Sequence, residues 1–66
     1  MGELLARKRN DYGYASFRQM AEEMGVDEST LDNVVRGDNL PGVKMMRAIV
    51  KGLDVSPEVL EEVMRQ

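Results

Sequence analysis

Five polar side chains recur at helical spacing near the middle of this 66-residue chain. They are Glu28, Ser29, Asp32, Asn33 and Arg36. Leu31, Val34 and Val35 recur at three- and four-residue intervals, so a helix here turns its apolar side inward and the polar side chains outward. These side chains offer hydrogen-bonding groups to an external partner. A recognition helix presents such positions to the major groove of duplex DNA.

The composition gives little support to catalytic or metal chemistry. The chain has no cysteine and no histidine. It therefore lacks thiolate ligands, the usual general base and the commonest metal ligand. The sequence also shows no pair of carboxylates that would lie together in an evident cleft, as acid–base catalysis requires. We therefore expect no enzyme activity, no metal and no cofactor.

The polar row must be positioned by the stretch Phe17–Arg36, which is typical of two short helices joined by a tight turn. The small side chain of Ala21 lets the second helix cross close to the first. Gly25 ends the first helix, because glycine readily adopts the left-handed conformation. Asp27 is a suitable N-cap for the second helix. The residues expected to share one core are Met20, Met24, Val26, Leu31 and Val34.

Three further helices are expected, over about residues 2–12, over about residues 43–53 and from Pro57. Ser16 with Gln19 fits a capping box at the start of the helix that contains Phe17, and Pro57 suits a first helical position. The expected inward positions of the two helices over 2–12 and 43–53 are Leu4, Leu5, Ala6, Tyr12, Val43, Met46, Ile49, Val50 and Leu53. The pattern predicts an all-α fold.

The net charge of −3 is unevenly distributed along the chain. Residues 1–18 sum to +2, residues 19–38 to −5, residues 39–53 to +3 and residues 54–66 to −3. Basic groups therefore flank the two central helices, whose own surface is acidic. The basic run at residues 7–9 is either a solvated helix surface or an electrostatic contact for phosphates or an acidic partner. Lys44, Arg47 and Lys51 form one basic strip.

The length predicts one small domain over residues 1–66, with a modest core. No apolar run approaches the ~20 residues of a membrane span, and the N-terminus lacks the apolar core of a signal peptide. We therefore expect a soluble cytoplasmic protein. The last helix carries an apolar stripe that either closes the core or forms a dimer contact. That stripe consists of Val59, Leu60, Val63 and Met64.

Over residues 14–60, the chain resembles the Cro and phage-repressor class of helix-turn-helix domains, also called XRE-type. The residues that carry the resemblance are Ser16, Met20, Ala21, Met24, Gly25, Val26, Ser29, Thr30, Leu31, Val34, Arg36, Gly37, Pro41, Leu53, Val55 and Ser56. The resemblance implies a compact five-helix, lambda-repressor-like fold with a central helix-turn-helix at about residues 17–36.

The resemblance also implies sequence-specific binding of duplex DNA by a phage or prokaryotic transcription regulator, as a homodimer on a two-fold operator. The helix over residues 28–36 would enter the major groove. Carried over by position, the base-reading candidates are Glu28, Ser29, Asp32 and Asn33. The phosphate-contact candidates are Arg18, Arg36, Asn39 and Lys44.

Two positions depart from the pattern of that class. Phe17 stands where a glutamine often contacts phosphate, and we expect it to pack in the core or on the first helix. Val35 stands where a glutamate often pairs with a basic residue of the first helix. The acidic recognition face leaves a second hypothesis open. In it, the scaffold is a protein-interaction module, antirepressor-like or DNA-mimic-like, that binds a basic protein.

Overall fold

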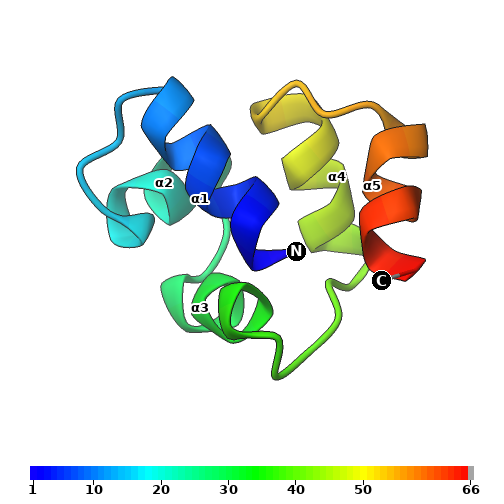
Figure 1. The fold of residues 1–66 in the computed structure, drawn as a ribbon. Coiled ribbons are helices and arrows are strands. Elements are labelled where there is room, and N and C mark those ends of the chain that lie inside the picture. Colours follow the sequence, from blue (N-terminus) through cyan, green and yellow to red (C-terminus); the bar gives the residue numbers. More distant parts are fainter. Residues whose placement is uncertain (66) are drawn as a thin grey trace.

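The computed structural model describes residues 1–65, which form five helices and no strand. The helices are α1 (Gly2–Asp11), α2 (Phe17–Met24), α3 (Glu28–Arg36), α4 (Val43–Gly52) and α5 (Pro57–Arg65). Figure 1 shows α1, α2 and α3 gathered on one side of the molecule, with α4 and α5 on the other. This arrangement confirms the all-α, five-helix prediction.

One apolar core joins the helices. Its buried members are Leu5, Met20, Ala21, Leu31, Val34, Met45, Ile49, Leu53, Val55 and Leu60. Both α1 and α2 pack against α3, and α4 packs against α2. Burying one leucine or isoleucine side chain contributes about 1.5–3 kcal/mol relative to exposure. The core therefore holds α3 rigidly on its inner side.

Local hydrogen bonds set the ends of α2 and α3. The Ser16 hydroxyl accepts the backbone N–H of Gln19 at 3.2 Å, and an Asp27 carboxylate oxygen accepts that of Thr30 at 3.1 Å. The Gln19 side chain accepts the N–H of Ala15 at 2.7 Å, one residue before the partner expected of a capping box. Gly25 ends α2 at φ 72°, in the left-handed region. Ser16 and Asp27 therefore cap the helices that they were expected to cap, and Gly25 ends α2 as expected.

The prediction that Tyr12 faces the core is wrong. Tyr12 is 42% exposed, because α1 ends at Asp11 and Tyr12 is its C-cap. Its ring packs on that of Tyr14, with 5.9 Å between the ring centroids. The inward side of α1 is centred on Leu5, which is fully buried.

The predicted inward stripe of α4 is also partly wrong, because Val43 is 62% exposed. The buried side chains of α4 are Met45 and Ile49, four residues apart. Met46 and Val50 are only half-buried. Successive residues of a helix are rotated by about 100° around its axis, so the many apolar residues of α4 occupy two neighbouring faces of the helix. One face enters the core, and the other looks toward α5.

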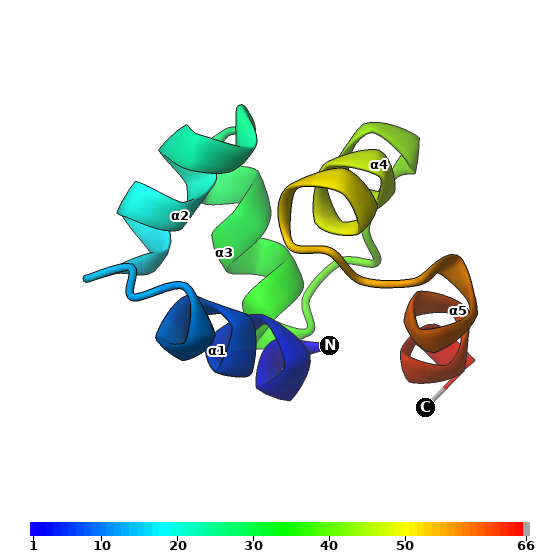
Figure 2. The same cartoon turned by 90° about the horizontal axis from the view of Figure 1, so that it is seen from above.

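The last helix lies at the edge of the molecule. Figure 2 shows α5 at the edge of the molecule and far from α2, and α5 packs against α4. The Ser56 hydroxyl caps α5 by accepting the N–H of Val59 at 3.2 Å. Leu60 is the buried side chain of α5, whereas Val59 is 48% exposed. The stripe of α5 therefore closes the core through Leu60.

Replacing Gly2 by alanine should destabilise the fold. A Cβ at Gly2 would lie 2.5 Å from the backbone oxygen of Val35, so the start of α1 must move away from α3. We expect a loss of about 1 kcal/mol, the lower end of overpacking costs, measured as a fall in Tm. Gly52→Ala is the control, because its Cβ would meet Met24 at an ordinary 3.6 Å. Equal Tm values for the two variants would contradict this packing.

Candidate nucleic-acid interface

The outward side of α3 carries the predicted reading residues. Glu28 and Ser29 in its first turn are exposed, whereas Asp32 and Asn33 are half-buried. Leu31 and Val34 hold the opposite side in the core. The structure therefore places these four polar residues on one helix, with two of them more accessible than the others.

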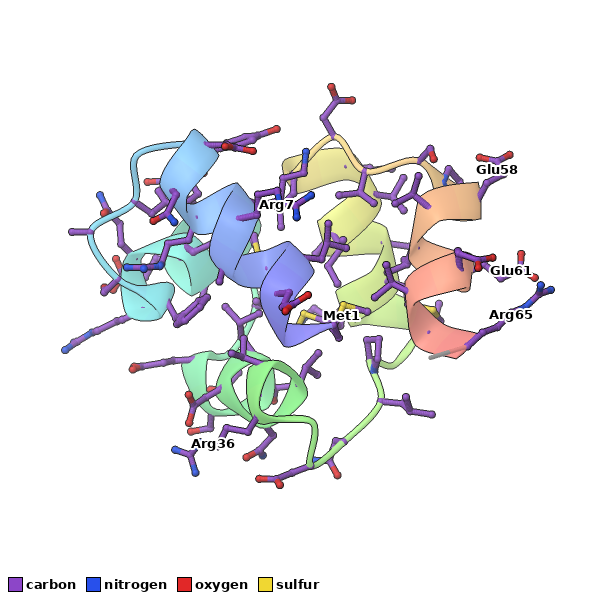
Figure 3. All side chains as sticks on the ribbon, in the orientation of Figure 1. Met1, Arg7, Arg36, Glu58, Glu61 and Arg65 are labelled. Atoms are coloured by element: carbon purple, nitrogen blue, oxygen red, sulfur yellow. The ribbon has the colours of Figure 1, made fainter. Side chains whose placement is uncertain are left out.

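Arg36 ends this row and points outward from α3, far from Glu58 on α5 (Figure 3). It forms an ion pair with Asp32, one turn earlier on the same helix. Both side chains remain accessible to solvent. Asp32 is one of the two carboxylates predicted to read bases, and its negative charge is thus offset by an arginine of the same helix.

Arg18 balances the other reading carboxylate from a different helix. Its Nε lies 3.9 Å from a carboxylate oxygen of Glu28 on α3 and 3.8 Å from one of Glu22 on α2. In the sequence, Arg18 belongs to the basic segment of residues 1–18. The fold instead brings it onto the acidic surface, so that surface is less negative than its sequence segment.

These exposed ion pairs are weak enough to exchange partners. The arginine and carboxylate side chains concerned are 38–73% accessible, and such pairs contribute about 0–1 kcal/mol. A phosphate oxygen is also a good partner for a guanidinium group, because it accepts charge-assisted hydrogen bonds in the same geometry. Arg18 and Arg36 are therefore cations that a phosphate can recruit.

The start of α2 contains a contact that the sequence analysis missed. The Arg9 guanidinium lies over the Phe17 ring, 5.1 Å from its centroid, and its Nη1 donates to the Ala15 carbonyl at 3.5 Å. This geometry is a cation–π interaction. It confirms that Phe17 packs on the first helix, and it shows that Arg9 is more than a solvated charge. The pair is eight residues apart in sequence, and only the turn between α1 and α2 brings it together.

The remaining phosphate candidates are Asn39, within the loop between α3 and α4, and Lys44, just after it. Asn39 and Lys44 are both exposed. Gly37 ends α3 at φ 83°, and the N–H of Asp38 then donates to the Asn33 carbonyl at 2.9 Å. Pro41 is buried and anchors the loop. Lys44 lies in the first turn of α4, at the end of this loop.

The predicted dimer stripe on α5 is divided between two faces. Leu60 is buried and Met64 borders a hollow beside α4, so neither belongs to the outermost face. Val59 is largely exposed and Val63 is half-buried, and neither lines that hollow. Any contact made by the outer face of α5 therefore depends on Val59 and Val63.

Within residues 1–65, no group of three or more histidine, cysteine or acidic side chains is placed to hold a metal ion. None of the helices over those residues is long and apolar enough to cross a membrane.

Comparison with known proteins gives three findings. A family model described as "Helix-turn-helix" matches residues 5–60. Two curated relatives, from two strains of Mycobacterium tuberculosis and each named an uncharacterized HTH-type transcriptional regulator, are 39% identical over 54 residues. That match covers 82% of this chain but only 39% of each relative. No solved structure matches the chain.

Proposed function

This chain belongs to the helix-turn-helix family, and we propose on that premise that it binds duplex DNA as part of a transcription regulator. Membership of this family also confirms the expectation that the chain is not an enzyme. The names of the two relatives support a role in transcription. The observation that carries the proposal is the row of outward polar side chains on α3, held by a buried inner side.

In the proposed complex, α3 lies in the major groove. Glu28 and Ser29 in its first turn contact base edges, followed by Asp32 and Asn33. An asparagine amide pairs with adenine in two places, and a carboxylate accepts a hydrogen bond from the cytosine amino group. The exposure of Glu28 and Ser29 supports this placement.

Phosphates hold the protein in register in this proposal. Arg18 and Arg36 exchange their carboxylate partners for phosphate oxygens. Asn39, in the loop after α3, and Lys44, in the first turn of α4, also contact the DNA backbone. A homodimer on a two-fold operator doubles these contacts. The exposed Val59, with Val63 beside it on α5, is the contact that we propose for the dimer.

The ion pairs favour DNA over a basic protein as the partner. If α2 and α3 mimicked DNA, their carboxylates would stand free, whereas Arg18 contacts Glu22 and Glu28 and Arg36 contacts Asp32. This surface carries both donors and acceptors. A basic protein partner is therefore an outcome of the test below, not a second proposal.

Charge reversal at Lys44 should weaken DNA binding. The test is the fluorescence anisotropy of a labelled mixed-sequence duplex, titrated with protein at rising salt. Lys44→Glu should lower the affinity about tenfold or more at low salt and flatten the log–log salt slope by about one per lost contact. Lys51→Glu, two turns along the same helix and equally exposed, should leave both quantities close to those of the unaltered chain.

Two results would contradict the proposal. Equal losses in Lys44→Glu and Lys51→Glu would mean that overall charge, and not a phosphate contact, sets the affinity. No binding by the unaltered chain at about 50 mM salt and tens of micromolar protein would exclude a useful phosphate contact. The acidic surface would then be tested against basic proteins.

A further inference from the structure

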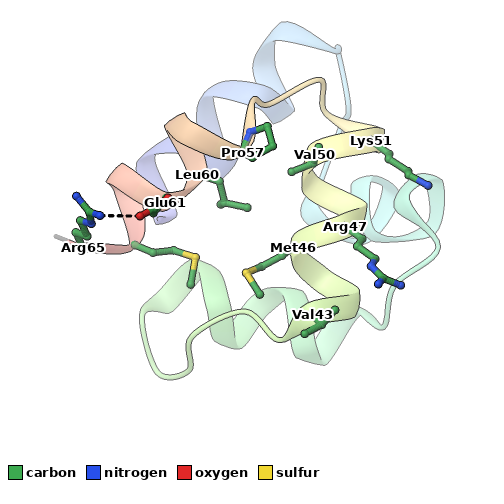
Figure 4. A pocket seen from close by; sticks show the side chains of 10 residues that line it. Val43, Met46, Arg47, Val50, Lys51, Pro57, Leu60, Glu61 and Arg65 are labelled. Atoms are coloured by element: carbon green, nitrogen blue, oxygen red, sulfur yellow. Dashed lines mark hydrogen bonds and ion pairs between the residues drawn. The ribbon is translucent and has the colours of Figure 1, made fainter.

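An apolar groove of about 590 Å³ separates α4 from α5. Met46 and Val50 from α4 face Pro57 and Leu60 from α5 across it (Figure 4). Its volume lies in the range of binding sites, about 300–1,000 Å³. Lys44, which is proposed to contact DNA, does not line this groove. Lys44, Arg47 and Lys51 together line a neighbouring hollow between α2 and α4, so the groove borders the surface proposed to bind DNA.

The groove leaves apolar side chains in contact with water. Val43 at its end is 62% exposed, and Met46, Val50 and Met64 are half-buried. Contiguous exposed apolar surface of this kind marks sites of interaction more often than isolated apolar residues do. Methionine side chains adapt well to the shape of a partner, because they are unbranched and polarizable.

The two edges of the groove differ in charge. Arg47 and Lys51 line the α4 edge, and their charged ends point away from α5 (Figure 4). Within residues 1–65, neither of them forms an ion pair. On the α5 side, Arg65 pairs with Glu61 at 2.6 Å, so these two charges cancel. One edge is therefore positive and the other close to neutral, in a chain whose net charge is −3.

We propose that this groove binds an amphipathic helix of another protein, with carboxylates along the flank that meets α4. A helix is about 10 Å wide with its side chains, so one seated in the groove extends over the α4 edge. Carboxylates on that flank then reach the charged ends of Arg47 and Lys51. Apolar residues spaced three and four apart fill the groove, as in other helix-in-groove complexes. This interaction goes beyond DNA binding and does not depend on it.

A second copy of the chain fits this groove less well than a foreign helix. The acidic helix that a copy offers is α5, but its Leu60 is buried in its own core. Only Val59 and Val63 remain on its outer face. Two apolar residues one turn apart are too few to fill a groove that takes anchors from two helical turns. The outer face of α5 and the groove are thus different surfaces, and binding at one leaves the other free.

The test uses the full chain with ¹³C-labelled methionine methyl groups, observed by NMR. The probe is a synthetic helical peptide of about three turns, with leucines at i, i+3, i+4 and i+7 and glutamates on one flank. We expect the methyl signals of Met46 and Met64 to shift on titration. The signal of Met20, a residue of α2 that is fully buried in the core, should stay in place.

Charge-reversed variants test the α4 edge. The double variant Arg47→Glu with Lys51→Glu should lower the affinity for the peptide about tenfold or more, while duplex binding persists. The variant Arg7→Glu with Lys8→Glu carries the same change in charge on α1, away from the groove, and should keep the affinity for the peptide. Loss of peptide binding with retained duplex binding separates this proposal from the proposed function.

Four results would overturn the proposal. A matched peptide with lysine for glutamate should bind much more weakly, so equal binding by that peptide would contradict the argument from charge. Equal binding by a peptide with scrambled leucine spacing would show that the partner need not be an amphipathic helix. Shifts of Met46 and Met64 on dilution alone would assign the groove to a second copy. Displacement of the peptide by duplex DNA would assign Arg47 and Lys51 to phosphate contacts.

Discussion

Replacing Ala21 by leucine is expected to destabilise the protein by about 1–3 kcal/mol, the usual cost of overpacking a core. Ala21 is 1% exposed and lies in α2, the helix that packs against α3. A leucine there requires the two helices to separate. Met20 of α2 and Leu31 of α3 also belong to the one core cluster, so separating these two helices destabilises the whole fold.

The measurement is Tm by circular dichroism. In a domain of this size each kcal/mol lowers Tm by about 4–8 °C, so the expected fall is large. Ala15→Leu is the control, because Ala15 is exposed in the turn before α2. An unchanged Tm in Ala21→Leu would mean that α2 and α3 do not cross closely at this position.

The double variant Glu28→Gln with Asp32→Asn is expected to bind mixed-sequence duplex DNA about tenfold more tightly per subunit at low salt. A carboxylate about 6 Å from a phosphate costs roughly 0.7 kcal/mol in water, and two such costs disappear. The change also frees Arg36 from Asp32 and leaves Arg18 with Glu22 as its one remaining partner. Both arginines then become available to phosphates, so the salt dependence should steepen as well.

A matched control separates this effect from net charge. Glu58→Gln with Glu62→Gln removes the same two charges from exposed positions on α5, and it should change the affinity much less. Similar gains in the two double variants would place the effect in overall charge. A loss of affinity in the α3 variant would mean that its carboxylates hold the arginines in the position in which they bind phosphate.

Local features of this protein were predictable from its sequence. Ser16 and Asp27 cap the helices that they were expected to cap, and Gly25 ends α2 in the left-handed conformation. The buried positions Met20, Leu31 and Val34 were also expected. Caps and turns depend on atoms a few residues apart, and helical spacing alone identifies the inward side of a short amphipathic helix.

The faces of α4 were not predictable in the same way. Its apolar residues are too numerous to define one side, so spacing alone grouped the exposed Val43 with the buried Ile49. The helices packed around α4 determine which of its sides is buried. The side that meets the core buries Met45 and Ile49. The side toward α5 becomes a groove, because α5 covers it only in part.

By itself, the sequence determined an all-α chain, the N-caps of α2 and α3 and a polar row on the helix after Gly25. Only the tertiary structure decided which charges meet, because charges on different helices become neighbours through packing. It brought Arg18 from α2 to Glu28 on α3, and it laid Arg9 over Phe17. Periodicity describes one helix at a time, whereas the charge and shape of a surface depend on several helices together.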